Sequence, residues 1–488
     1  MARAGELKKP SASSAKGMPF IVSSNVDKAD SATRKLIRSH ARQGRTKKVN
    51  RRADEKRAAG WGTIAVRTQR SRVELRDVVE TYTPLVPGRI GSDIYFIEFP
   101  EQAEQSMVLN MARFSIIASG IIFPLRAAIG FQEDSQKWSY LFGLDPTTLH
   151  ITAFAVQGFV DRVLRRQESS TNPAAIMHFQ KGLRLLRERL LGNDDIIKVS
   201  NSTISAVMKL ASVAHFDGNC EASKHHMEGL SKMINLRGGL DVFKGTLLLM
   251  EAVRCDIGIA LLTGSAPTFY RQPSELLPEY PKKLIPVVDN KLRGTESIPI
   301  EDNELLMAWQ VMRKFCLLVD LGAQTERLIR PEIIDGTMAA VMYRLLHMDF
   351  ASDSIDEAIR HGLLTFSYHI FLQWQDIRPP YHRFATTFKN CIINLHKTDG
   401  ISPRLMLWLL IIGSVSIFDI ADDTWLRELM QEYADQCQVK TWKEMQEVLK
   451  SFMWIVLLDE PAGRKIYDLL GLKKGKPTES TQCPISFL

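Results

Sequence analysis

Cysteine is scarce and scattered in this 488-residue chain. The two nearest cysteines, Cys220 and Cys255, are 35 positions apart, so the sequence has no CxxC pair of the kind that holds structural zinc. The opening residues, MARAGELKKPSASS, have no apolar core, which argues against a secretory signal and for a reducing compartment. We therefore expect free thiols rather than disulfides at all six positions: Cys220, Cys255, Cys316, Cys391, Cys437 and Cys483.

Sequence signatures of catalysis are missing too. The peptide GLKKGKPT (471–478) has the wrong spacing for a phosphate-binding loop, and no GxGxxG, GxSxG or HExxH motif occurs. His225 and His226 are adjacent, so on a helix they point about 100° apart and cannot face one metal ion. His361 and His369 are two turns apart, which is equally unsuited to one ion. The sequence predicts no enzyme, no metal site and no cofactor.

No hydrophobic run is long enough to cross a bilayer. The most apolar stretch, LMLWLLIIGSVSIF (405–418), has fourteen residues and contains Gly413 and two serines. A membrane-spanning helix needs about 20 apolar residues. We interpret this stretch as a core helix and expect no membrane partner.

Positive charge is concentrated at the N-terminus. Residues 1–76 carry a net charge of +14 and the remaining chain −6, within a total of +8. Such a basic arm on a mildly acidic body is typical of proteins that bind polyanions or an import receptor, although a merely solvated tail has the same composition. Hydrophobic residues make up 45% and charged residues 24% of the sequence, which is typical of a soluble globular body.

Within this arm, Asp30 and Ser31 can cap a short helix. At 100° per residue, Arg34, Arg38, Arg42 and Arg45 lie within roughly 80° of one another, a stripe suited to phosphate contacts. The run KKVNRR (47–52) extends the charge and also resembles an import signal. The candidate nucleic-acid-binding residues are Arg34, Lys35, Arg38, Arg42, Arg45, Lys47, Lys48, Arg51 and Arg52.

Beyond the arm, apolar residues recur at helical spacing almost to the end of the chain. This pattern predicts an all-α fold with three parts: a basic, largely disordered N-terminal arm and linker over 1–92, a large helical domain over 93–472 and a disordered tail over 473–488. Asp145 and Pro146 start one helix, and Gly238-Gly239 end another. Two predicted core stripes are Phe179, Leu183, Leu186, Leu190 and Met227, Leu230, Met233, Ile234. Further helices are predicted at Met107–Leu125, Ala308–Leu321, Gly336–Phe350, Ile355–Gln373 and Trp442–Leu458.

Residues 175–243, which include HMEGLSKMINLRGGL (226–240), and the preceding DPTTLH (145–150) resemble fungal transcription-factor-like proteins. The resemblance extends over about 20–270 and includes the block from Phe20 to Ala41. Such proteins usually carry a six-cysteine binuclear zinc cluster, which this chain does not have. The resemblance implies a regulator or co-regulator of transcription in the nucleus, controlling a gene cluster such as one for secondary-metabolite biosynthesis.

Two mechanisms are compatible with that resemblance. The basic arm could contact DNA directly, or the helical body could dock on a DNA-binding partner protein. The rival interpretation is a helical binding module, or an enzyme with an apolar pocket, that has no role in transcription.

Overall fold

The computed structural model describes most of the chain from residue 145 onward. The chain divides into two compact units, Met1–Val78 and Val79–Leu488, and every described residue lies in the second. The predicted arm (1–92) and tail (473–488) lie outside the described residues. The described residues are Met111, Phe114, Leu125, 145–161, 172–271, 275–286, 298–373, 381–398, 400–420 and 423–471.

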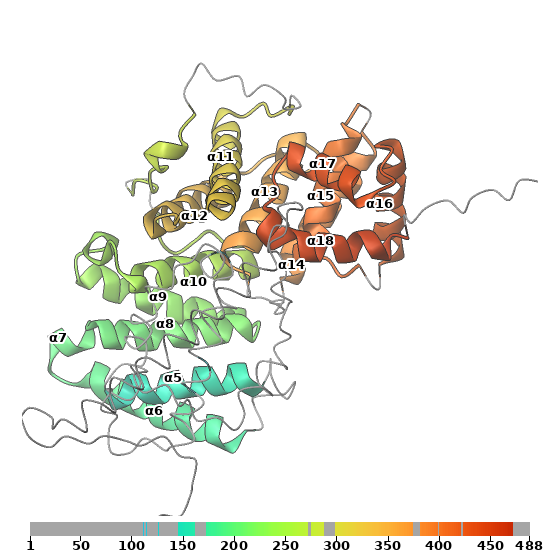
Figure 1. Cartoon of the computed structure of the whole chain (residues 1–488). Helices are drawn as coiled ribbons and strands as arrows, with labels where there is room; N and C mark the ends of the chain where they lie inside the picture. Colours follow the sequence, from blue (N-terminus) through green and yellow to red (C-terminus); the bar gives the residue numbers. More distant parts are fainter. Residues whose placement is uncertain are drawn as a thin grey trace, which may run out of the picture. The chain divides into compact units, whose positions relative to one another are not determined.

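The described part of the chain is all-α, as predicted, and contains no β-strand (Figure 1). Helix α5 packs against α6 and α8, and α8 packs in turn against α9 and α10. The helices up to residue 300 are α5 (Pro146–Phe159), α6 (Pro173–Leu191), α7 (Asp195–Lys198), α8 (Asn201–Phe216), α9 (Cys220–Leu236) and α10 (Leu247–Thr263), with the 3-10 helices η5 (Leu240–Phe243) and η6 (Lys282–Leu284).

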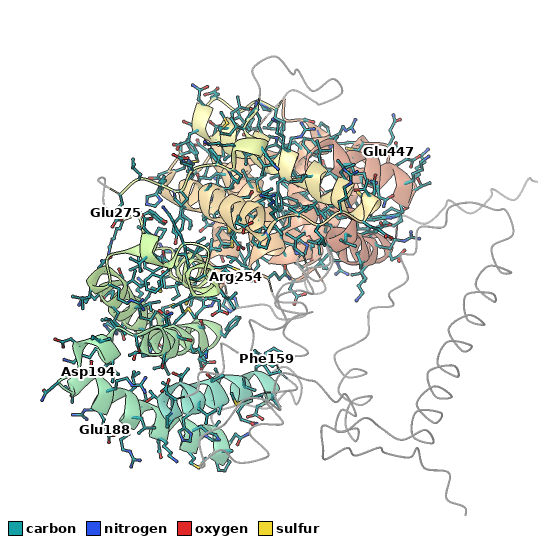
Figure 2. All side chains as sticks on the ribbon, turned by 60° about the vertical axis from the view of Figure 1, so that its left-hand side comes forward. Phe159, Glu188, Asp194, Arg254, Glu275 and Glu447 are labelled. Carbon is teal, nitrogen blue, oxygen red and sulfur yellow. The ribbon has the colours of Figure 1, made fainter. Side chains whose placement is uncertain are left out.

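The second half continues in the same way. Helix α10 contacts α12 and α14, so the two halves share an interface within this unit. The helices are α11 (Asn303–Thr325), α12 (Pro331–His347), α13 (Ile355–Phe371), α14 (His382–His396), α15 (Pro403–Ser416), α16 (Thr424–Gln436), α17 (Trp442–Ser451) and α18 (Val456–Leu469). Charged side chains such as Glu188 and Glu447 lie on the exposed faces of their helices (Figure 2).

The N-terminus of α5 shows how a capping residue also fixes neighbouring helices. The Asp145 side chain accepts hydrogen bonds from the backbone N–H groups of Thr147 and Thr148, at 3.0 and 3.2 Å. The same carboxylate pairs with Arg189 of α6 at 2.6 Å and accepts a hydrogen bond from Ser202 of α8. These hydrogen bonds and the ion pair lower the pKa of Asp145 to about 2, although partial burial opposes the shift. One carboxylate therefore holds three helices together.

Helix α15 is the centre of the second half. It contacts α13, α14, α16, α17 and α18, and it is buried on all sides from Leu405 to Ser416. Such complete burial requires apolar residues around the whole helix, which explains the run LMLWLLII (405–412). The prediction of a core helix here is confirmed. No described helix is long and apolar enough to cross a membrane.

The predicted stripe on α6 is only partly correct. Leu186 is buried, but Phe179 and Leu190 are 36% and 39% exposed. The buried residues of α6 are Ala175, His178, Gly182 and Leu186, and a Cβ at Gly182 would lie 2.8 Å from Ile151 of α5. Close approach of the two helices decides which face is buried, and helical spacing alone does not reveal it. The second stripe (Met227, Leu230, Met233 and Ile234) is buried as predicted.

The helix predicted over Trp442–Leu458 is wrong in its length. Helix α17 ends at Ser451 and α18 begins at Val456, with a buried, non-helical segment, Phe452–Ile455, between them. The Met453 carbonyl accepts a hydrogen bond from the Trp408 indole at 2.8 Å, and the Asp459 side chain accepts one from the Ile455 N–H at 2.6 Å. One tertiary and one local hydrogen bond thus satisfy these two backbone groups, and the apolar pattern does not reveal the break.

Candidate functional site

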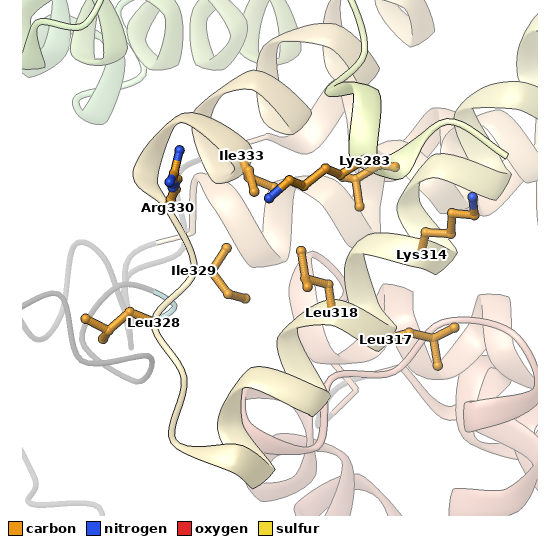
Figure 3. Close-up of a pocket in the computed structure, with 9 residues that line it drawn as sticks. Lys283, Lys314, Leu317, Leu318, Leu328, Ile329, Arg330 and Ile333 are labelled. Atoms are coloured by element: carbon orange, nitrogen blue, oxygen red, sulfur yellow. The ribbon is translucent and has the colours of Figure 1, made fainter. Parts of the chain in front are cut away.

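One hollow among the described residues is an open groove between η6, α11 and the start of α12, which we call the cationic groove (Figure 3). Its cavity measures about 380 Å³. The apolar lining consists of Leu284, Leu317, Leu318, Leu328, Ile329 and Ile333. Its three polar lining residues are all cations, namely Lys283, Lys314 and Arg330.

The connection between α11 and α12 forms one wall of this groove. Glu326 adopts a left-handed conformation (φ 52°) and ends α11, and the Arg327 N–H donates to the Gly322 carbonyl at 3.0 Å. A Cβ at Gly322 would lie 3.1 Å from the Arg327 carbonyl, so glycine permits this tight return of the chain. The return buries Ile329 and leaves Leu328 61% exposed at the edge of the groove.

The cations of the groove are available to a ligand. Lys314 donates a hydrogen bond from Nζ to the Ile285 carbonyl at 2.7 Å, which fixes its ammonium group at the rim. Lys283 and Arg330 are exposed, and neither forms an ion pair with a described residue. The groove therefore offers three positive charges around an apolar floor.

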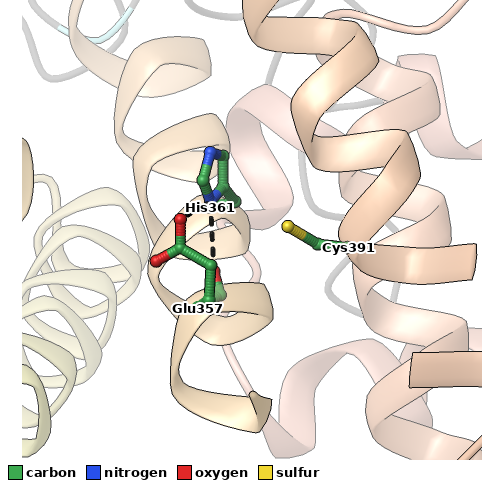
Figure 4. Close-up of side chains that lie close together, drawn as sticks. All are labelled: Glu357, His361 and Cys391. Carbon is green, nitrogen blue, oxygen red and sulfur yellow. Dashed lines mark hydrogen bonds and ion pairs between the residues drawn. The ribbon is translucent and has the colours of Figure 1, made fainter. Parts of the chain in front are cut away.

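A second cluster contains residues with metal-binding chemistry. Ligand atoms of Glu357 and His361 on α13 and of Cys391 on α14 lie within 4.8 Å of one another, and all three residues are buried (Figure 4). The His361 Nδ1 atom lies 3.1 Å from the Glu357 carbonyl oxygen and 3.2 Å from its Oε1 atom. The sequence prediction considered His361 only with His369 and missed Glu357, although a Glu and a His four positions apart share one helix face.

The ion pair in this cluster does not favour a further cation. Arg360 donates to both carboxylate oxygens of Glu357, at 2.7 and 2.5 Å, and so already neutralises that charge. Burial lowers the pKa of His361 to about 4, and the Arg360 charge adds to the shift. Burial raises the pKa of Cys391 to about 11, so its thiol stays protonated at neutral pH. Because Arg360 occupies both carboxylate oxygens of Glu357, we assign the cluster to structure.

His150, His215 and His361 are buried and neutral in the folded protein at neutral pH. His150 and His178 approach each other through their Nδ1 atoms at 2.9 Å, and His215 Nε2 lies 2.7 Å from the Tyr381 hydroxyl oxygen. Burial lowers the pKa of His150 and of His215 to about 4, as it does for His361. Protonation of any of these imidazoles at acidic pH would place a positive charge in the protein interior.

This pattern predicts acid sensitivity. Below pH 6.5 the unfolded chain binds protons at these histidines that the folded chain does not, so stability falls as pH falls. Burial raises the pKa of Asp256 and of Asp320 to about 6. Protonation of these two carboxyls in the folded chain partly offsets the loss of stability as pH falls. We expect the free energy of unfolding to decrease by about 1–2 kcal/mol between pH 7.5 and 6, measured by urea titration of the full chain. A constant or rising stability over this interval would contradict the assignment.

The nine candidate nucleic-acid-binding residues, Arg34 to Arg52, all lie outside the described residues. The structure therefore does not test whether these nine residues lie together. His225 and His226 lie on α9, and His226 is half-buried with its pKa lowered by burial. The cationic groove was not predicted, because its residues come from three segments that only the tertiary fold assembles.

Comparison with protein-family models, with curated proteins and with solved structures finds no match to this chain. The resemblance of residues 145–243 to fungal transcription-factor-like proteins therefore stays a prediction from those residues.

Proposed function

We propose that this protein is a regulator or co-regulator of gene expression in the nucleus and not an enzyme. The observation that supports this most is the separation of charge, with +14 on residues 1–76 and −6 on the rest. A basic arm attracts nucleic-acid phosphates, while an acidic body does not compete for them. The all-α body, with an open groove, suits contact with other proteins.

Two routes to DNA follow from this arrangement. In the first, the arginine stripe of the arm contacts phosphates, which positions the protein without reading sequence. In the second, the helical body binds a DNA-bound partner, which supplies the choice of sequence. The resemblance to fungal transcription-factor-like proteins adds the regulation of a gene cluster, such as one for secondary metabolism, to either route.

The first route predicts a salt-dependent affinity for duplex DNA. If Arg34, Arg38, Arg42 and Arg45 each contact one phosphate, their share of the log–log slope of affinity against salt is about −3.6. Replacing all four by Ala should remove that share and weaken binding to every sequence alike. The measurement is fluorescence anisotropy of labelled duplexes titrated with the full chain at several salt concentrations.

The matched control replaces the same four arginines by Lys. This variant keeps the charge, so its salt slope should stay close to that of the unaltered protein. If the Ala variant keeps the full slope, the stripe is only a solvated helix face and the partner route is the better account.

The cationic groove supports a second candidate function, a helical binding module without a role in transcription. Cellular location separates the two. A fluorescent fusion that stays in the cytosol, together with unchanged transcripts in a deletion strain, would favour the binding module.

A further inference from the structure

Exposed leucines extend the cationic groove along α11. Leu317 and Leu321 are 55% and 57% exposed and lie one helical turn apart, so they form an apolar line on one face. Leu328 adds a third exposed leucine at the groove edge. Large apolar side chains that gather on a surface mark sites of protein contact.

The charged residues that line the groove indicate the charge of a suitable ligand. Lys283, Lys314 and Arg330 line the groove, and no carboxylate does, although the chain after residue 76 is acidic overall. The Lys314 ammonium uses one N–H on the Ile285 carbonyl and retains two for a ligand. Carboxylates placed along the groove would meet all three cations.

We propose that the cationic groove, with Leu317 and Leu321, is a docking site for an acidic amphipathic helix of a partner protein. Apolar residues at helical spacing on the partner would cover the leucine line and enter the groove, and flanking carboxylates would pair with the cations. A small amphiphile could fill the cavity of about 380 Å³ but would leave Leu321, which lies outside the groove lining, uncovered. This inference depends on the groove alone and holds whether or not the arm contacts DNA.

The termini of this chain have the wrong charge to be the occupant. Residues 1–76 carry a net charge of +14, and residues 473–488 contain three lysines and one glutamate. Like charges at a groove disfavour docking, so both segments are repelled. An acidic partner is a better match than either terminus.

The test uses a fluorescent 18-residue probe with Leu at every third or fourth position and Glu and Ala elsewhere. We expect saturable binding to the full chain, measured by anisotropy, and much weaker binding of a probe with the same composition in scrambled order. Reversing two exposed cations, Lys283→Glu with Arg330→Glu, should weaken binding about 10–100-fold, taking roughly three- to tenfold for each lost pair. Leu317→Ser with Leu321→Ser should weaken it to a similar extent.

Matched controls change exposed residues elsewhere. Lys443→Glu on α17 and Leu236→Ser on α9, where Leu236 is 76% exposed, should leave probe binding unchanged. Circular dichroism and the melting temperature verify that each variant is folded.

Equal binding by the groove variants and the unaltered chain, or equal binding of both probes, overturns the proposal. If dodecanoate displaces the probe and the leucine variant binds the probe with unchanged affinity, the groove is assigned to a small amphiphile. If the chain self-associates through the groove in sedimentation, the groove is assigned to a second copy. Both outcomes also overturn the proposal.

Discussion

Replacing Trp408 by Ala is expected to lower the free energy of unfolding by about 3–5 kcal/mol. The Trp408 side chain is fully buried on α15, and its ring packs against those of Trp309, Phe366 and Phe452 at centroid distances of 5.2, 6.3 and 5.9 Å. Truncation opens a cavity among these rings and leaves the Met453 carbonyl without its indole donor. Urea unfolding of the full chain, followed by far-UV circular dichroism, measures the loss.

Two comparisons test the reason for this loss. Trp408→Phe keeps most of the volume and removes the hydrogen bond, so it should cost less than the Ala variant. Trp425 is only partly buried and lies against Lys389, with a distance of 5.0 Å from Nζ to the ring centroid. Trp425→Ala should therefore cost less than Trp408→Ala. If the two Ala variants are equally stable, the central role of Trp408 in the core is refuted.

Replacing Arg360 by Met should destabilise the protein by about 3–5 kcal/mol, because it leaves the Glu357 carboxylate buried and unpaired. Glu357 is 6% exposed, and Arg360 supplies two of its hydrogen bonds. An unpaired buried carboxylate has a raised pKa, so the variant binds a proton in the folded state at a pH where the unfolded chain does not. Its deficit against the unaltered protein should therefore shrink as pH falls from 7 towards 5, as measured by urea titration at each pH.

The double variant Arg360→Met with Glu357→Gln is the control. It removes the charge together with its partner, and glutamine keeps an acceptor close to His361. It should recover much of the lost stability and show no such pH dependence. Equal stability of the single and double variants would show that the loss comes from packing and not from the unpaired charge.

Helical periodicity was sufficient to predict the fold class. The stripe on α9 and the apolar run of α15 are buried as expected, because the apolar side of α9 and all sides of α15 face the core. The prediction fails where backbone approach decides the outcome. On α6 the small residue Gly182 selects the buried face, and between α17 and α18 the hydrogen bond from Trp408 to Met453 accompanies a break in the helix.

The candidate sites were less predictable, because they too depend on how the helices pack in the tertiary fold. Glu357 and His361 could have been paired from their spacing, whereas Cys391, on the next helix, could not. The cationic groove joins Lys283 with Lys314 and Arg330 from separate segments, and no local pattern marks it. The arm residues remain a prediction from charge and helical spacing.

The burial of α15 has a consequence for synthesis of the chain. Three of the helices that cover it, α16, α17 and α18, are made later, and Leu469 at the end of α18 is 53 residues beyond Ser416. At roughly 5–20 residues per second, a ribosome needs about 3–10 s to make that stretch. During this interval the run from Leu405 to Ile412 lacks part of its native cover. The yield of soluble protein then depends on how well chaperones shield this run, which makes α15 the expected origin of aggregation.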